Sequence, residues 1–349
     1  MEDGNAYKLS QVNHMSRYFN SGPKNLITDV SGILVGNSQD EHLKSGVSIL
    51  YGKEPFIAGV HVMGGAPGTR ETELLAPDKL VQMADAIVLS GGSAFGLDAA
   101  SGVTDQLLIN GRGFPTSAMS VPIVPSAILY DLNNGGDKIW TQNPYKKLGV
   151  EAFKSVSSNF TLGTSGAGYG ATTANLKGGL GSASLVLDNG CTVGALVAVS
   201  SVGSTVMGIS RHFWAAPFEL DGEFGNLGIM QNYDGRETGW SKKNPFEGEA
   251  TTIGIVATDA SLNKAQVTRM AVAAHDGIAR AIFPSHTPFD GDLIFSISTG
   301  KINMKEPSFD NMKIGHAAAQ CVARSIARAV YNAKSEMNDT LPAWRDLDE

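Results

Sequence analysis

Short apolar runs separated by turn residues constrain the fold of this chain more than any other sequence feature. The runs are rich in valine and isoleucine and are bounded by glycine, aspartate or asparagine, which is typical of β-strands. With 41 glycines and 42% hydrophobic residues among 349, the chain has both the turns and the apolar mass for a large core. The runs cover residues 27–36, 46–51, 56–62, 86–89, 184–187, 193–199, 253–258 and 293–297.

Helices are predicted in three places. Residues 261–264 contain serine and asparagine, which favour a helix N-cap, and an apolar stripe at helical spacing follows them. Residues 311–333 are rich in alanine and have an apolar face. Residues 93–108 form a third helical pattern, in which Gly96 and Gly102 lower the helix propensity. Strands and helices do not alternate regularly, which favours a layered α+β fold over a doubly wound parallel sheet.

Composition and charge exclude several classes of function. The net charge is −7 and no cluster of Lys and Arg is present, so no nucleic-acid partner is expected. The two cysteines and seven histidines lack the spacing of a metal site, and we expect neither a metal nor another cofactor. No apolar run reaches the roughly 18 residues of a membrane span, and residues 1–24 lack a signal-peptide pattern. A soluble cytoplasmic protein without a membrane partner is therefore expected, unless a leader has been trimmed from the sequence.

The run at residues 250–259 begins with Ala250, Thr251 and Thr252. A threonine at the start of a buried strand is either an ordinary β-branched residue or a nucleophile uncovered when the chain is cut just before it. The glycine-rich segment 220–249 precedes this run and is predicted to be a long loop. We expect the loop to bring the bond before Thr251 within reach of solvent.

Two carboxylates, Asp290 and Asp292, precede the predicted strand 293–297. On an extended segment, side chains two residues apart point the same way. One interpretation is an Asx-turn that starts the strand. The other is a carboxylate pair that orients a cationic group or a hydroxyl nucleophile.

Glycine-rich segments at 64–72, 90–97 and 166–170 match neither the P-loop nor the dinucleotide-binding motif. They are interpreted either as turns between strands or as main chain whose N–H groups line an oxyanion hole. Lys177 lies among small residues, where it is either a desolvated base with a lowered pKa or a solvated turn lysine. Tyr130 fits a core aromatic residue as well as a catalytic one.

Together these segments resemble the DmpA-type aminopeptidase family, which includes the nylon-oligomer hydrolases and the β-aminopeptidases. The likeness extends over most of the chain and keeps one order, which is more specific than any single short motif. The segments are residues 25–33, 64–75, 89–103, 176–184, 193–203, 251–266 and 275–299.

The resemblance implies a four-layer αββα sandwich, related in architecture to the N-terminal-nucleophile hydrolases. We expect one catalytic domain over residues 25–334, with loosely held tails at 1–24 and 335–349. The resemblance also implies a homo-oligomer, a tetramer or larger, that acts on small peptide or amide substrates without a cofactor.

Self-cleavage between Ala250 and Thr251 is a further implication, and it would leave a large chain 1–250 and a small chain 251–349. The Thr251 hydroxyl would attack the preceding carbonyl and shift the acyl group from nitrogen to oxygen before water releases it. The freed α-amine, with an ordinary pKa of about 7.7–8.0, can then act as the base for the same hydroxyl.

Residue roles follow from the matched positions. Thr251 resembles the family nucleophile, and Asp290 and Asp292 resemble the acidic pair beside it. Tyr130 resembles the tyrosine that borders the pocket, and its neighbour Asp131 is a candidate to bind a substrate amine.

Further candidate binding residues are Gly91, Gly92 and Ser93, whose main chain is expected to border the site. Family members with a threonine nucleophile also use a partner lysine. Gapless alignment places Asn175 at that position, and Lys177, two residues on, is the nearest candidate.

Two departures from the family pattern concern the chemistry. Ala250 stands where family members usually have asparagine or glycine, and Ser200 stands where an asparagine donates to the oxyanion. Losing one such donor typically costs roughly 2.7–4 kcal/mol in the barrier, about a hundred- to a thousandfold in rate.

The sequence therefore predicts a serine/threonine-type aminopeptidase or amidohydrolase that acts on short peptides or amino-acyl amides. The alternative is an uncleaved or catalytically impaired family member that serves as a binding or assembly module.

Overall fold

The computed structural model describes residues 19–236, 242 and 250–347. Its strands are β1 (Asn20–Ser21), β2 (Ile33–Asp40), β3 (Ser45–Val62), β4 (Thr69–Arg70), β5 (Met83–Ser90), β6 (Phe114–Pro115), β7 (Ser120–Val121), β8 (Ser126–Ile128), β9 (Gly179–Val186), β10 (Thr192–Ser200), β11 (Thr251–Ala260) and β12 (Leu293–Ile302). Its α-helices are α1 (Ala99–Ile109), α2 (Tyr145–Lys154), α3 (Lys264–Ala279) and α4 (Pro307–Tyr331).

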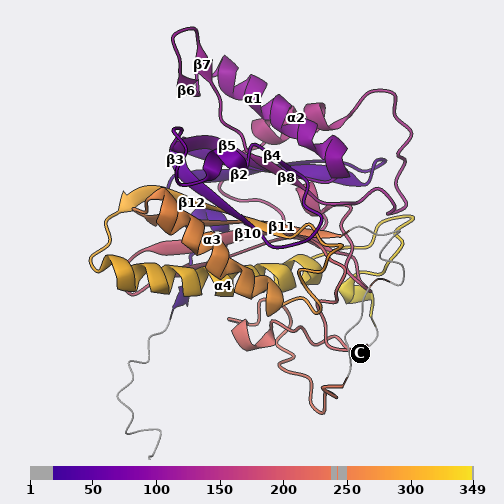
Figure 1. Cartoon of the computed structure of the whole chain (residues 1–349). Coiled ribbons are helices and arrows are strands. Elements are labelled where there is room, and N and C mark those ends of the chain that lie inside the picture. Colours follow the sequence, from indigo (N-terminus) through magenta and orange to yellow (C-terminus); the bar gives the residue numbers. More distant parts are fainter. Residues whose placement is uncertain (1–18, 237–241, 243–249, 348–349) are drawn as a thin grey trace, which may run out of the picture.

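Ten strands form one hydrogen-bonded sheet. Nine of them follow the order β1-β9-β10-β11-β12-β3-β5-β8-β4, and β2 pairs with β3 off this path. The long strand β3 belongs to two half-sheets. Its first half pairs with β2 and β5, with Val47 opposite Ser90, and its second half pairs with β12, with Val62 opposite Leu293. The β2-β3-β5-β8 half-sheet therefore lies over the β9-β10-β11-β12 half-sheet while remaining joined to it (Figure 1).

Three buried apolar clusters separate the layers. The inner cluster lies between the half-sheets and brings Leu50 and Leu89 together with Leu196, Ile255 and Phe295. A second cluster packs α3 and α4 on the outer face of β9 to β12, and a third packs α1 and α2 on β3 and β5. The resulting order of helix, sheet, sheet and helix, visible in Figure 1, is the expected αββα sandwich.

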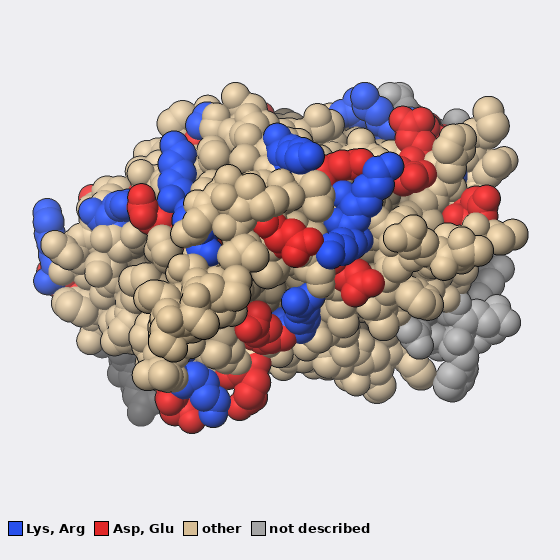
Figure 2. Space-filling model, turned by 90° about the horizontal axis from the view of Figure 1, so that it is seen from above, with Lys and Arg blue, Asp and Glu red and all other residues tan. Residues whose placement is uncertain are grey.

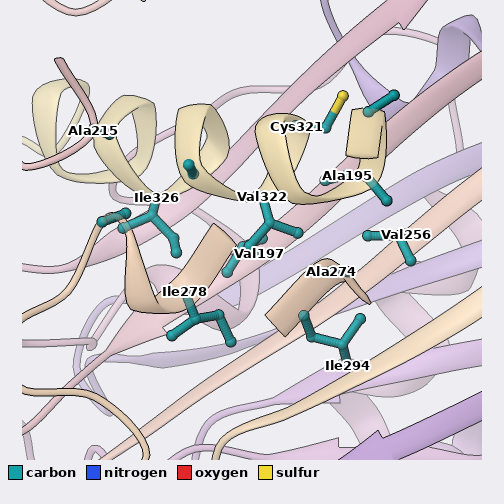
Figure 3. Packing of buried hydrophobic residues seen from close by; sticks show 14 of the residues in the cluster. Ala195, Val197, Ala215, Val256, Ala274, Ile278, Ile294, Cys321, Val322 and Ile326 are labelled. Carbon is teal, nitrogen blue, oxygen red and sulfur yellow. The ribbon is translucent and has the colours of Figure 1, made fainter. Parts of the chain in front are cut away.

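Strand β11 is buried on both faces. Ile253 and Ile255 face the inner cluster and Val256 faces the outer one, as the alternation of side chains along a strand requires. This arrangement explains why the run 253–258 is continuously apolar, since a strand covered on both sides has no polar face. Figure 3 shows the outer cluster at Val197, Val256, Ile294, Ile278 and Val322.

The helix predictions are confirmed for α3 and α4 and are incomplete elsewhere. The Asn263 side chain caps α3 by accepting a hydrogen bond from the Gln266 N–H at 2.9 Å. The predicted helix 93–108 is a 3₁₀ turn over Ser93–Asp98 followed by α1. Helix α2 was not predicted, because Gly149 interrupts its pattern. A Cβ at that glycine would lie 2.1 Å from the Ala99 carbonyl oxygen, so the glycine permits close approach of α1 and α2.

The two segments expected to be loosely held tails are attached to the body of the protein where the structure describes them. Residues 1–18 lie outside the described part, whereas Asn20 and Ser21 form β1 and pair with β9. The C-terminal segment 335–347 is not loosely held. Trp344 is buried and stacks on Phe213, with ring centroids 5.5 Å apart.

Trp344 supplies a test of how strongly this segment is held. Its indole N–H donates to the Arg211 carbonyl at 3.0 Å, and the Arg211 guanidinium lies 4.1 Å from its ring. Because Trp344→Ala would leave a large cavity, we expect it to lower the free energy of unfolding by about 3–5 kcal/mol in urea denaturation. The control Ile139→Ala, at a side chain that is 95% exposed, should change it little. Equal stability of the two variants would contradict tight docking.

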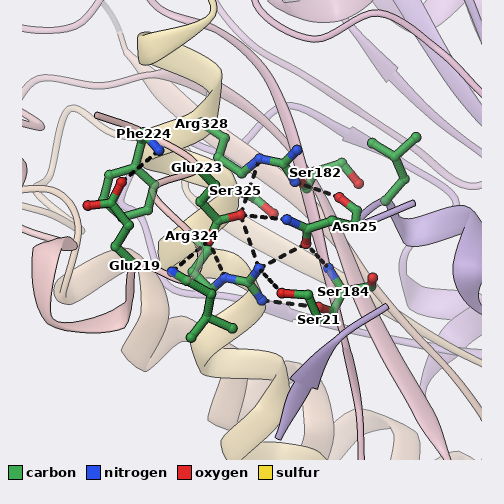
Figure 4. A network of polar contacts seen from close by, with 12 residues as sticks. Ser21, Asn25, Ser182, Ser184, Glu219, Glu223, Phe224, Arg324, Ser325 and Arg328 are labelled. Carbon is green, nitrogen blue, oxygen red and sulfur yellow. Dashed lines mark hydrogen bonds and ion pairs between the residues drawn. The ribbon is translucent and has the colours of Figure 1, made fainter. Parts of the chain in front are cut away.

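A buried ion-pair network anchors the start of segment 220–249 (Figure 4). Arg324 of α4 donates from Nε to Glu223 Oε1 at 2.5 Å and from Nη2 to Asn25 Oδ1 at 2.8 Å. Asn25 Nδ2 in turn donates to Glu223 at 2.6 Å. Three distant segments are therefore fixed together, and the long loop leaves the body from a rigid point.

The face seen in Figure 2 shows no single-signed charged patch. In the view of Figure 2, acidic and basic side chains are intermixed on the face seen from above. Across the described residues, every helix is too short or too polar to cross a bilayer.

Candidate active site

Thr251 lies at the start of β11, on the face that points between the two half-sheets. It shares this face with Ile253, and it lies directly opposite Ser200, the last residue of β10. Ala250 is fully buried and Thr251 is only 3% exposed. The expectation that the preceding loop brings this bond into solvent is therefore wrong, because both residues of the bond are buried.

The carbonyl group of Ala250 accepts two hydrogen bonds. The Thr251 hydroxyl donates to its oxygen at 2.7 Å, and the Gly291 N–H donates to it at 2.9 Å. Ala250 also forms a parallel bridge with Asp290. The bond before Thr251 is thus held in a fixed geometry, with its carbonyl polarised by two donors.

Gly291 is required by the close packing at this point. A Cβ there would lie 2.7 Å from Thr251 Oγ1 and 2.6 Å from the Ala66 carbonyl oxygen. The glycine-rich segment 64–72 packs on the same loop, with the Ala66 N–H donating to the Asp290 carbonyl at 2.9 Å. Its main chain therefore supports the acidic loop.

Asp290 is buried and accepts hydrogen bonds at both carboxylate oxygens. Oδ1 accepts the Val202 N–H at 3.0 Å, and Oδ2 accepts the Thr287 N–H at 3.1 Å and hydroxyl at 2.5 Å. Burial, followed by the nearby Asp292 carboxylate, raises the pKa of Asp290 to about 6. The bonds to Thr287 run back along the chain, whereas the predicted Asx-turn requires a bond to the N–H two residues on, and the bond to Val202 ties this loop to the end of β10.

Asp292 connects β11 to the loop that precedes β12. Oδ1 accepts the Thr252 N–H at 2.8 Å, and Oδ2 accepts the His286 N–H at 3.0 Å. Asp292 thus acts on the main chain directly after Thr251, whereas Asp290 acts on the main chain of Val202 and Thr287. Asp292 therefore fixes the strand that carries Thr251 through a main-chain bond, which is closer to the second interpretation of the pair than to the Asx-turn.

Ser200 is fully buried and bridges two neighbouring segments. Its hydroxyl lies 3.3 Å from the carbonyl oxygens of both Tyr130 and Thr172. This places the predicted pocket residue Tyr130 beside the end of β10. The Ser200 hydroxyl is directed to main-chain carbonyls of the protein itself, which is a different role from donation to an oxyanion.

Lys177 is desolvated, as one interpretation held, but it is paired. It is 3% exposed, and its ammonium lies 2.5 Å from Asp339, whose other oxygen lies 2.5 Å from the Lys44 ammonium. Desolvation lowers the pKa of Lys177, and the Asp339 carboxylate opposes that shift. At the aligned lysine position, Asn175 Oδ1 accepts a hydrogen bond from the Ser204 hydroxyl at 3.1 Å.

Asp131 holds the neighbouring glycine turn. Its carboxylate accepts the Gly92 N–H at 2.7 Å and the Ser45 hydroxyl at 2.6 Å, and it is 2% exposed. Burial raises the pKa of Asp131 to about 6. Because both oxygens are engaged inside the protein, the structure favours a supporting role for Asp131 over binding of a substrate amine.

The N–H groups of Gly91, Gly92 and Ser93 are also engaged. Gly91 donates to the Gly46 carbonyl at 2.9 Å, and Ser93 donates to the Leu129 carbonyl at 3.0 Å. With Gly92 bonded to Asp131, all three amides donate within the protein. The oxyanion-hole interpretation of this segment is therefore wrong in this structure, and Gly291 supplies the donor next to Thr251 instead.

Lys242 is a site residue that sequence reasoning missed. Its N–H donates to the Val202 carbonyl at 3.1 Å, and Val202 is the residue whose own N–H binds Asp290. Burial lowers the pKa of Lys242 to about 8, and attraction to the Asp290 carboxylate opposes the shift. The available signal was a lysine in the loop before Thr251, which in a sequence looks like any solvated charge.

Comparison with known proteins gives consistent matches over the length of the chain. An uncharacterized aminopeptidase of Mycobacterium tuberculosis is 38% identical over 348 residues, which is 93% of this chain and 98% of the relative. A 6-aminohexanoate-oligomer endohydrolase of Paenarthrobacter ureafaciens is 26% identical over 294 residues, with 81% and 78% covered. The solved l-aminopeptidase d-ala-esterase/amidase of Ochrobactrum anthropi, described as a variant of the Ntn hydrolase fold, aligns with a TM-score of 0.67 at 21% identity, covering 94% of this chain and 92% of that one.

The fold and these matches define a hydrolase that acts on amide or peptide bonds. The model of peptidase family S58 matches residues 25–340, and the chain belongs to this family.

Proposed function

We propose that the chain cuts itself between Ala250 and Thr251 and that Thr251 then serves as the N-terminal nucleophile of an aminopeptidase. The observation that carries this proposal is the buried Ala250 carbonyl. Its oxygen accepts the Gly291 N–H and lies 2.7 Å from Thr251 Oγ1. A hydroxyl placed against the carbonyl before it needs no approach by diffusion.

The cut proceeds by transfer of the acyl group. Thr251 Oγ bonds to the Ala250 carbonyl carbon, the C–N bond breaks, and the hydroxyl proton passes to the departing nitrogen. The Gly291 N–H stabilises the negative charge that develops on the carbonyl oxygen. Water then hydrolyses the ester and leaves a carboxylate on Ala250 and a free amine on Thr251.

The same groups serve the hydrolysis of a substrate amide. After the cut, the Gly291 N–H is released to bind a substrate carbonyl, while the Thr251 amine takes the proton of its own hydroxyl. Asp292 keeps its bond to the Thr252 N–H, so the new terminus stays at the start of β11. The substrates are short peptides or amino-acyl amides, and the relatives named for aminopeptidase or amidase activity support this class.

Intact mass and denaturing electrophoresis test the proposal. Wild-type protein should yield fragments of residues 1–250 and 251–349, and Thr251→Ala should remain at 36.6 kDa and hydrolyse no amino-acyl p-nitroanilide. Thr252→Ala, at a buried neighbour on the same strand, is the control and should still be cut. A wild-type chain that stays whole, or a Thr251→Ala chain that is cut at the same bond, would overturn it.

A slow or uncut family member is the second candidate. It is favoured by the Ser200 hydroxyl, which faces the Tyr130 and Thr172 carbonyls. In that case Ser200→Asn, which restores an amide donor, should speed the cut or the hydrolysis. An active wild-type enzyme with no gain from this change would eliminate the second candidate.

A further inference from the structure

Three histidines from separate elements form consecutive ring contacts, and the last of them, His286, lies next to Asp292. His61 lies on β3, His275 on α3, and His286 in the loop before β12. The ring centroids of His61 and His275 are 5.1 Å apart, and those of His275 and His286 are 5.0 Å apart. His286 Nδ1 lies 2.9 Å from Asp292 Oδ2, at ion-pair distance but outside hydrogen-bond alignment. The series therefore leads from the helix layer to the carboxylate that holds the Thr251 strand.

His286 approaches one carboxylate oxygen with both its main chain and its ring. Its N–H donates to Asp292 Oδ2 at 3.0 Å, the same oxygen that the ring faces. Its φ is +55°, a left-handed conformation that is strained for a residue with a side chain unless the surroundings enforce it. Such strain is commonly kept where a side chain must point in one direction.

His275 fixes the ring of His286 from behind. Its Nε2–H donates to the His61 carbonyl at 3.0 Å, because a carbonyl oxygen can only accept. Desolvation lowers the pKa of His275 to about 4 and also lowers that of His61, so both rings are uncharged near neutral pH. In the described ranges, His, Cys, Asp and Glu form no group of three placed to hold a metal ion. His61 and His275 therefore serve as uncharged rings that pack behind His286 and orient its ring.

We propose that His286 is a positioning residue for amide hydrolysis, which holds Asp292 in the orientation that fixes the Thr252 N–H and thereby Thr251. The inference rests on the proposed function, because Thr251 is the residue that becomes positioned. Nothing in the chemistry requires His286 to touch the substrate. Its contribution is geometric, and misplacement of a nucleophile by about 1 Å can cost about a hundredfold in rate.

Two isosteric variants test the proposal. Asparagine and aspartate both tolerate positive φ, so His286→Asn and His286→Asp impose a similar backbone and size. His286→Asn sets a neutral amide against Asp292, retains the main-chain N–H that binds it, and should keep kcat within about fivefold of wild type. His286→Asp sets a second carboxylate against Asp292 and should lower kcat about a hundredfold with a smaller change in KM. The control pair His316→Asn and His316→Asp, at an exposed position on α4, should be equivalent.

The pH dependence separates positioning from a loss of folding. The ionisable groups around His286 are Asp292 and Asp290 of its own loop, His275 of α3 and His61 of β3. Two facing carboxylates share a proton at a raised pKa, so falling pH removes their repulsion. The kcat ratio of the two His286 variants should therefore approach one as pH falls from 8 to 5. If His286→Asp matches His286→Asn at pH 8, or the ratio does not change with pH, the proposal is wrong. Failure of the proposed function would show instead as uncut wild type.

Discussion

Replacing Gly291 with alanine is expected to slow the cut before Thr251 by at least about a hundredfold. The new methyl group would lie 2.7 Å from Thr251 Oγ1 and 2.6 Å from the Ala66 carbonyl, so the loop must move. That movement takes away the N–H that donates to the Ala250 carbonyl. Loss of one donor to a developing oxyanion typically costs a hundred- to a thousandfold.

The rate is measured by intact mass at timed intervals after cell-free synthesis of the precursor. Gly254→Ala is the matched control, because the nearest atom to a Cβ at that position of β11 is Val197 Cγ2, at an ordinary 3.4 Å. Both variants should melt cooperatively. A Gly291→Ala chain cut at the wild-type rate would show that the Gly291 N–H has no part in the reaction.

Asp290→Asn is expected to slow self-cleavage about 10- to 100-fold at pH 8. It should also abolish the fall in the self-cleavage rate that the wild type shows as pH drops through about 6. The Asp290 carboxylate accepts hydrogen bonds from the Val202 and Thr287 N–H groups, and an asparagine would turn its own N–H₂ group toward one of these donors. A hydrogen bond to a charged group is worth about 1.5–3 kcal/mol. The pKa of Asp290 is raised from 3.8 to about 6. The carboxylate is therefore present above pH 6 and is lost as pH falls through that value.

Self-cleavage isolates this titration, because the Thr251 amine does not yet exist in the precursor. Hydrolysis by the cut enzyme should show an additional limb near pH 8 from that amine, whose ordinary pKa is about 7.7–8.0. Asp276→Asn, at an exposed position of α3, is the control and should leave the profile unchanged. An acid limb that persists in Asp290→Asn would assign it to another group.

The parts of the fold with regular patterns were predictable from the sequence. The apolar run 253–258 identified the core of β11, and its continuous hydrophobicity reflects burial by helices on one face and a second half-sheet on the other. Asn263 gave the start of α3. Helix α2 was missed because Gly149 serves a close approach to α1, a demand set by a partner more than 40 residues away.

The site was less predictable, because its geometry depends on contacts between distant segments. Thr251, Asp290 and Asp292 follow from the resemblance, but no local pattern shows that Gly291 supplies the donor. Lys242 could not be distinguished from a surface lysine without knowing that Val202 joins it to Asp290. The expected exposure of the bond before Thr251 failed for the same reason, since the bond is buried and is contacted by Gly291, a residue distant in the sequence.

The position of the small chain within the sheet has a consequence for stability after the cut. Strands β11 and β12, which belong to residues 251–349, lie between β10 and β3, which belong to residues 1–250. The two products of the proposed cut would therefore be interleaved, and neither could leave without breaking a strand ladder on both sides. Unfolding of the cut protein would separate two chains instead of unravelling one. Refolding would then require the two chains to associate, at a rate that depends on their concentration. A cut molecule of this design would be long-lived once formed and poorly able to re-form, so its durability would rest on the barrier to opening.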